Sequence, residues 1–122
     1  SFAICATKAA FNQSEDWLNE LNQYIQNNKD YAISFIQKEM NDVYVVPTEA
    51  TYLLWIDCHK GCLDSVELTS FIGKKTGLYV SDGLEYGENG KAFIRMNVAC
   101  PFERLKDGLN RFKEGIYLYQ NK

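Results

Sequence analysis

The longest pattern in the chain is a row of apolar residues at helical spacing between Ser14 and Met40. These residues recur every three to four positions, as on one face of an amphipathic helix: Trp17, Leu18, Leu21, Tyr24, Ile25, Tyr31, Ala32, Phe35, Ile36 and Met40. Ser14 is the expected N-cap, and the acidic residues after it suit the positive end of a helix. Such a helix is about 40 Å long, which matches or exceeds the width of a domain of this size. We therefore expect part of it to pack against something else, unless Asn27-Asn28 kinks it.

The next patterns predict two strands and a second helix. Residues 42–46 and 51–57 are rich in β-forming side chains and are separated by a hairpin-like turn. The second strand is almost continuously apolar, so we expect it to be a central strand that is covered on both faces. The stretch Asp64–Glu67 has the spacing of a capping box, and the apolar stripe that follows ends at Gly77. A short strand is expected around residues 78–80.

After the glycine-rich loop of residues 81–91, a strand over residues 92–98 carries one cation. Alternation places Ile94, Met96 and Val98 on one face and Phe93, Arg95 and Asn97 on the other. Arginine stays charged and is seldom buried unless it is paired. Arg95 therefore pairs with an internal carboxylate, such as Asp57 or Glu85, or binds an external anion. Pro101 is the expected first residue of a last helix, with Leu105, Leu109, Phe112 and Ile116 at helical spacing.

The order helix, two strands, helix, two strands, helix predicts an α+β fold. We expect a small, mostly antiparallel sheet with helices on one face and a long N-terminal helix. A chain of 122 residues with 46% hydrophobic residues is long enough for one core and too short to expect two. The alanine-rich stretch Phe2–Phe11 predicts a further helix that begins without a cap. This indicates a domain cut from a larger protein; a processed terminus or a cloning scar is the alternative.

Charge and composition argue against several partners. Sixteen acidic and thirteen basic residues give a net charge of -3, without long runs of one sign. This pattern does not favour nucleic acid or an anionic membrane surface as a partner. No apolar stretch is long enough to span a bilayer, and no signal sequence opens the chain, so a cytoplasmic protein is expected.

The cysteines and the single histidine have no clear catalytic or metal-binding context. Cys5, Cys58, Cys62 and Cys100 lie in apolar surroundings, and reduced, buried thiols are expected. Cys58 and Cys62 are close in sequence, yet a structural zinc site needs four ligands and the other thiols belong to distant segments. No metal is expected, and His59 is interpreted as a loop residue.

Four segments carry a resemblance to a known family, in the family's order and spacing: Ala9–Leu18, Val46–Asp57, Ser81–Gly87 and Phe93–Pro101. Together they resemble the C-terminal small domain of fold-type-I pyridoxal-phosphate enzymes, the class I/II aminotransferase superfamily. Within it, the chain is most similar to the cystathionine β-lyase-like carbon-sulfur lyases. The segment with Arg95 is the most specific.

The resemblance implies that Arg95 binds the α-carboxylate of an amino-acid substrate. Tyr86 lies in a segment that usually carries Phe and approaches the substrate, and Tyr52 is a second candidate contact. Both are by default packing residues. Ala50 stands where many relatives have Gly, which puts the placement of Tyr52 in question.

The resemblance also implies a cofactor that this chain does not hold. Family members bind pyridoxal 5'-phosphate through a lysine of a large domain, which is absent here. Residues 1–122 would then be the small domain, with residues 1–40 as a long linking helical segment. We expect this piece to contain no catalytic or cofactor-binding residue and to be inert alone, while its parent is an aminotransferase or a carbon-sulfur β-lyase, and commonly a homodimer. Two other hypotheses stay open: a free-standing amino-acid-binding regulatory module and a purely structural domain.

Overall fold

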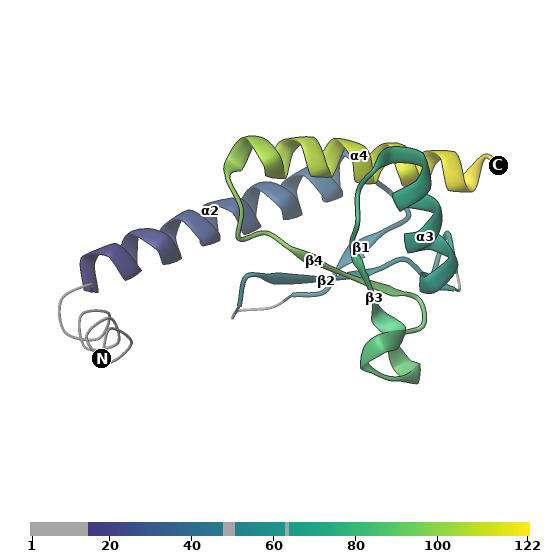
Figure 1. Ribbon diagram of the computed structural model, residues 1–122, viewed down its shortest axis with the longest axis horizontal. Helices are drawn as coiled ribbons and strands as arrows, with labels where there is room; N and C mark the ends of the chain where they lie inside the picture. Colours follow the sequence, from purple (N-terminus) through teal and green to yellow (C-terminus); the bar gives the residue numbers. More distant parts are fainter. Residues whose placement is uncertain (1–14, 48–50, 63) are drawn as a thin grey trace, which may run out of the picture.

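The computed structural model describes residues 15–47, 51–62 and 64–122 and has an α+β fold in two layers (Figure 1). The elements in chain order are helix α2 (Glu15–Glu39), strands β1 (Tyr44–Val45) and β2 (Leu53–Asp57), helix α3 (Ser65–Thr76), strand β3 (Ser81–Asp82), the 3-10 turns η1 (Gly83–Tyr86) and η2 (Glu88–Gly90), strand β4 (Phe93–Asn97) and helix α4 (Phe102–Gln120). The helices lie on one side of the sheet, while η1 and η2 extend from its other side. The predicted fold class is confirmed.

The sheet is antiparallel throughout, with the strand order β1-β2-β4-β3. Trp55 on β2 and Ser81 on β3 are the register partners of Arg95 on β4. Because residues directly opposite each other point to the same face, these three side chains form one row across the sheet. The predicted strand at residues 78–80 was wrong by a few residues. Residues 78–80 form an irregular connection after α3, where the Thr76 hydroxyl accepts a hydrogen bond from the backbone N–H of Leu78.

The core lies between the sheet and the helices. Leu54 and Ile56 on β2, and Ile94 and Met96 on β4, are buried against the helical layer, together with Phe112 of α4. The expectation that β2 is covered on both faces is met in full only on the face toward the helices. On the outer face, the alternate residues of β2 are only half-buried, and aromatic side chains cover part of that face in place of a second helical layer.

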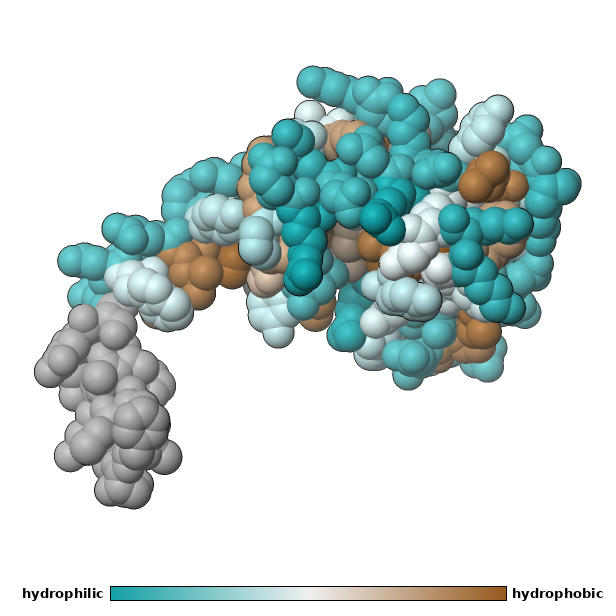
Figure 2. Space-filling model, turned by 45° about the horizontal axis from the view of Figure 1, so that its top comes forward, coloured by the Kyte–Doolittle hydropathy of each residue, from teal (hydrophilic) through white to brown (hydrophobic). Residues whose placement is uncertain are grey.

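Helix α2 runs unbroken through Asn27-Asn28 and is only partly covered. Its buried Asn28 donates hydrogen bonds from Nδ2 to the carbonyl oxygens of Val98 and Cys100, at 2.9 and 2.8 Å, which fix the helix to the β4–α4 connection. The earlier half of α2 extends beyond the sheet with hydrophobic side chains on its surface (Figures 1 and 2). Exposed apolar residues there are Trp17, Leu18, Leu21 and Tyr24. The predicted cap Ser14 and the predicted helix Phe2–Phe11 lie outside the described residues.

The ends of the later helices follow the sequence signals closely. Asp64 caps α3 by accepting from the backbone N–H groups of Val66 and Glu67, and Gly77 ends α3 in the left-handed conformation. Only half of the capping box forms: the backbone N–H of Asp64 donates to Cys62 Sγ, and the Glu67 carboxylate pairs with Lys122. Pro101 is the N-cap of α4 rather than its first helical residue. No described helix has the length and apolarity needed to cross a membrane.

Two glycines of α4 give a matched test of how α3 and α4 pack. A Cβ at Gly115 would lie 2.8 Å from Cγ1 of buried Ile72, whereas a Cβ at Gly108 meets nothing nearer than Leu78 at 3.7 Å. We expect Gly115→Ala to lower the free energy of unfolding by about 1–3 kcal/mol through overpacking. Gly108→Ala should raise it by about 0.5–1 kcal/mol, because alanine favours the helix. Urea denaturation of the two variants measures both values, and equal effects would contradict the close α3–α4 contact.

Candidate functional site

Arg95 lies at the centre of the outer face of the sheet and is half-buried. Within the described part of the chain, no carboxylate lies within ion-pair distance of its guanidinium. Asp57, one of the two candidate internal partners, contacts His59 instead, with 2.6 Å between Oδ1 and the ring Nδ1. Glu85, the other candidate, is exposed and forms no ion pair with Arg95. The internal-carboxylate alternative for Arg95 is therefore not found among these residues.

Aromatic rings surround the guanidinium in place of a carboxylate. The Cζ atom of Arg95 lies over the ring of Tyr86, 4.5 Å from its centroid. Trp55 meets Tyr86 edge-on, with 5.9 Å between ring centroids and an interplanar angle of 71°. Trp55 also stacks on Phe93, with ring centroids 5.4 Å apart and planes 20° from parallel. We call these three rings with Arg95 the aromatic cluster.

Tyr86 is placed by the turn structure between β3 and β4. Asp82 caps η1 by accepting a hydrogen bond from the backbone N–H of Glu85. Buried Gly83 and Gly90 then let the backbones of η1 and η2 approach so closely that a Cβ on either would collide with the other's carbonyl oxygen. The loop predicted from its glycines is thus two compact turns that carry Tyr86 toward Arg95.

An open hollow of about 250 Å³ adjoins Arg95. Arg95, Ser81 and Asn97 supply its polar side chains, and its remaining walls are Leu53, Leu78, Tyr79, Val80 and Met96. A cation, a hydroxyl and an amide in one hollow suit a small ligand that carries a carboxylate.

Tyr52 lies elsewhere. It lines a different hollow with residues of α2, among them Asn22, Ile25 and Gln26. Its neighbour Thr51 has φ of 73°, a conformation that residues other than glycine rarely adopt. The structure therefore brings Tyr86, but not Tyr52, next to Arg95. Ala50 lies outside the described residues.

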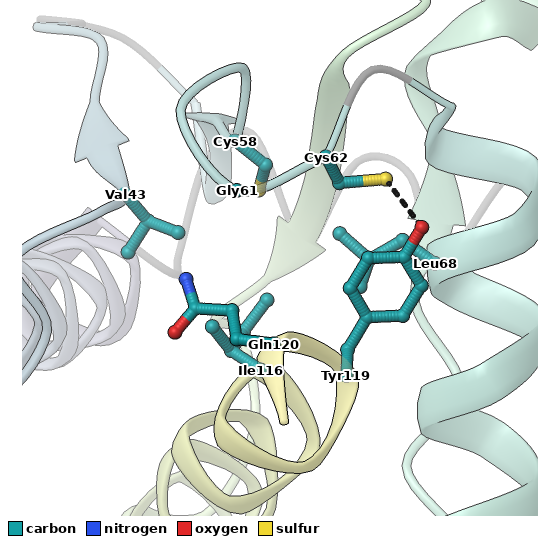
Figure 3. Close-up of a pocket in the computed structure, with 8 residues that line it drawn as sticks. All are labelled: Val43, Cys58, Gly61, Cys62, Leu68, Ile116, Tyr119 and Gln120. Atoms are coloured by element: carbon teal, nitrogen blue, oxygen red, sulfur yellow. Dashed lines mark hydrogen bonds between the residues drawn. The ribbon is translucent and has the colours of Figure 1, made fainter. Parts of the chain in front are cut away.

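Cys58 and Cys62 line a separate, small and largely apolar cavity of about 10 Å³ between the residue 58–62 loop and α4 (Figure 3). Burial raises the pKa of the Cys58 thiol to about 12, so this thiol stays protonated and is a poor nucleophile. Cys62 Sγ is hydrogen-bonded to the Tyr119 hydroxyl at 3.2 Å, and this bond is the first cause of the raised pKa of Tyr119. Cys58, Cys62 and Cys100 are free thiols, and Cys5 lies outside the described residues.

Metal-binding geometry is not found in the described ranges, where no three potential ligands gather. His59 sits in an exposed loop after β2, but Asp57 partners its ring, which the sequence reasoning missed. Asp57 lies two residues before His59, and that spacing was the available signal. Among the described residues, no hydrogen bond joins this pair to a nucleophilic side chain, so it does not add a second candidate site.

The chain is similar to part of several larger enzymes. Cystathionine beta-lyase PatB of Bacillus subtilis (strain 168) is 34% identical over 116 residues, which covers 95% of the chain and 30% of PatB. Protein MalY of Escherichia coli (strain K12) is 28% identical over 107 residues, which covers 88% of the chain and 27% of MalY. No family model matches the chain.

Solved structures agree with the sequence relatives. A protein of Clostridium difficile 630 with bound pyridoxal phosphate, assigned as an aminotransferase, matches with a TM-score of 0.90 and 36% identity, over 94% of the chain and 30% of that protein. The pyridoxal-phosphate-bound C-S lyase of Staphylococcus hominis, complexed with L-cycloserine, matches with a TM-score of 0.83 and 32% identity, over 91% of the chain and 27% of the lyase.

The chain is thus homologous to the C-terminal portion of pyridoxal-phosphate-dependent aminotransferases and carbon-sulfur lyases. Its sequence relatives include cystathionine β-lyases, which confirms the resemblance seen in the sequence. The chain spans about 30% of the length of the relatives it matches.

The hollow at Arg95 does not by itself fit the cofactor of these relatives. Pyridoxal phosphate is held in enzymes as a Schiff base to a lysine, with a charged partner for its ring nitrogen. The hollow at Arg95 has no lysine in its lining. The features on the outer face suit a carboxylate ligand, and they do not provide an anchor for the cofactor's aldehyde.

Proposed function

We propose that this chain is the C-terminal substrate-binding domain of a pyridoxal-phosphate-dependent aminotransferase or carbon-sulfur β-lyase that acts on an amino acid. In this proposal, Arg95 binds the α-carboxylate of the substrate. The observation that carries the proposal is an arginine on an open sheet face, beside a hollow, with no carboxylate partner among the described residues.

The chemistry of the two groups supports this assignment. Guanidinium and carboxylate are planar forks that pair through two parallel, charge-assisted hydrogen bonds. An ammonium group cannot reproduce this geometry. A substrate held at one end by such a pair has its α-carbon fixed relative to the sheet, and fixing the reacting atom lowers the entropic part of the barrier. The residues of this chain would therefore bind and orient the substrate.

The remaining parts of the enzyme would come from the parent protein. Residues 1–122 would form the small domain, and residues 1–40 would link it to a large domain that holds pyridoxal phosphate, which acts as an electron sink when bound. The apolar surface on the projecting half of α2 is consistent with such a covered position. The parent would be a homodimer. On this basis the chain alone is inert.

The two tyrosines differ in the support that they receive. Tyr86 lies against the guanidinium of Arg95 and can reach a ligand bound there. Tyr52 lies beside α2 in another hollow, so its proposed contact with the substrate loses support. Both lyases and aminotransferases occur among the relatives, and the choice between the two reactions depends on groups outside this chain.

Activity assays on the parent protein and on the isolated chain test the proposal. With pyridoxal phosphate added, we expect the parent either to release pyruvate from cystathionine or to form a keto acid from an amino-group donor. The isolated chain should do neither and should show no Schiff-base absorbance. Turnover by the chain alone would contradict the proposal. Amino-acid binding by the chain alone, abolished by Arg95→Ala, with no enzymatic activity in the parent, would favour the regulatory module.

A further inference from the structure

We propose that Trp55 and Tyr86 are positioning residues that hold the Arg95 guanidinium in the orientation needed to bind a carboxylate. This inference rests on the proposed function of Arg95. Trp55 is not marked out by any pattern in the sequence, and its role follows from the geometry of the aromatic cluster.

The first step is that Arg95 needs a support. A free arginine side chain has many rotamers, and a two-point bond to a carboxylate requires one fixed orientation of the fork. An internal carboxylate would fix it, but would occupy the N–H donors that the ligand needs. In the described ranges, the guanidinium lies against the face of Tyr86, 4.5 Å from Cζ to the ring centroid.

The second step is that an aromatic face holds a guanidinium without using its hydrogen-bond donors. The attraction acts between the cation and the ring's π-electrons, while the N–H groups point outward along the edges of the planar fork. A guanidinium supported in this way keeps its donors available for a ligand. The hollow beside Arg95 offers the space for such a ligand.

The third step is that Tyr86 itself needs a support, which Trp55 supplies. Tyr86 stands on the short turn η1 and is 51% exposed, so its backbone alone does not fix the ring. Trp55 contacts the Tyr86 ring edge-on and stacks on Phe93 with its own ring. Trp55 is also the register partner of Arg95 on the neighbouring strand. The sheet thus aligns Trp55 with the residue that it positions.

The test uses the parent holoenzyme with substitutions that remove or keep the rings. Tyr86→Leu and Trp55→Leu should raise KM for the amino-acid substrate about fivefold to tenfold, with a smaller effect on kcat. Tyr86→Phe retains the ring and should rescue most of the affinity that Tyr86→Leu loses. Tyr117→Leu replaces an exposed tyrosine of α4, in the other layer, and is the control for a general effect of losing a tyrosine.

Two readouts separate positioning from a loss of structure. The inhibition constant of an L-amino acid should rise in Tyr86→Leu, whereas that of the matching primary amine, which lacks the carboxylate, should stay within about twofold. In an Arg95→Lys background, Tyr86→Leu should not lower the affinity for the amino acid any further, because the guanidinium that Tyr86 positions is gone.

The outcomes distinguish this inference from the proposed function. If Arg95→Lys weakens binding of the amino acid but Tyr86→Leu does not, the positioning role is overturned and the carboxylate role of Arg95 stands. If Arg95→Lys leaves amino-acid affinity unchanged, both are overturned. If Tyr86→Leu lowered the affinity for the amino acid and for the amine equally, the positioning role would also be overturned. Should Trp55→Leu fail to fold, the exposed Tyr86 variants decide the inference by themselves.

Discussion

Arg95→Lys in the parent enzyme is expected to lower kcat/KM for its amino-acid substrate by about 100-fold. The substitution keeps the positive charge but removes the planar fork and one of the two parallel hydrogen bonds. Breaking one side of a desolvated, hydrogen-bonded charge pair costs about 2–5 kcal/mol, and about 2.7 kcal/mol corresponds to this factor. Steady-state kinetics with the natural substrate, at saturating pyridoxal phosphate, measures the change.

The matched control is Arg104→Lys. Arg104 is an exposed arginine near the start of α4 and lines a different hollow from Arg95. Its replacement should change kcat/KM by less than about twofold, because surface substitutions away from special features have small effects. Equal kinetics for Arg95→Lys and Arg104→Lys would refute the carboxylate role. Unchanged cofactor absorbance in both variants would show that the large domain is intact.

The layers of this fold were predictable because apolar residues repeat at a different spacing in strands than in helices. Alternation in β4 placed Ile94 and Met96 inward and Arg95 outward, as the structure has them. Helical spacing predicted α2 and α4, and a polar cap and a glycine predicted the ends of α3. The misplaced strand at residues 78–80 shows the limit of such reasoning. Its apolar residues are compatible with a strand, but pairing with β4 begins only at Ser81.

The site was harder to predict because it depends on how distant strands align. The register of β2 against β4 brings Trp55 opposite Arg95, and no local pattern in either strand specifies that alignment. Tyr52 is the opposite case, since a local signal was present. Tyr52 lies just before β2, in alternation with Leu54 and Ile56, which face the helices, and it lines a hollow with α2. Alternation along β2 therefore argues against a place for Tyr52 beside Arg95.

The second large effect is expected from Gly90→Ala, which should lower the free energy of unfolding by about 3 kcal/mol. Gly90 is buried, and a Cβ there would collide with the backbone carbonyl of Gly83. Because the obstacle is backbone, no side chain can move aside, and η1 and η2 would have to separate. Since η1 carries Tyr86, we also expect a higher KM for the amino acid in the parent. Urea denaturation of the chain and kinetics of the parent measure the two effects.

Gly87→Ala is the control that separates close packing from backbone strain. Gly87 lies between the same two turns with φ of 127°, yet a Cβ there meets no atom within 4 Å. Its replacement should lower the free energy of unfolding by about 1–2 kcal/mol, because of the unfavourable backbone conformation alone. Gly90 does not have a positive φ, so its larger cost would come from the contact with Gly83. If Gly90→Ala proved as stable as the unmodified chain, η1 and η2 would not be held together by this contact, and the placement of Tyr86 over Arg95 would need another cause.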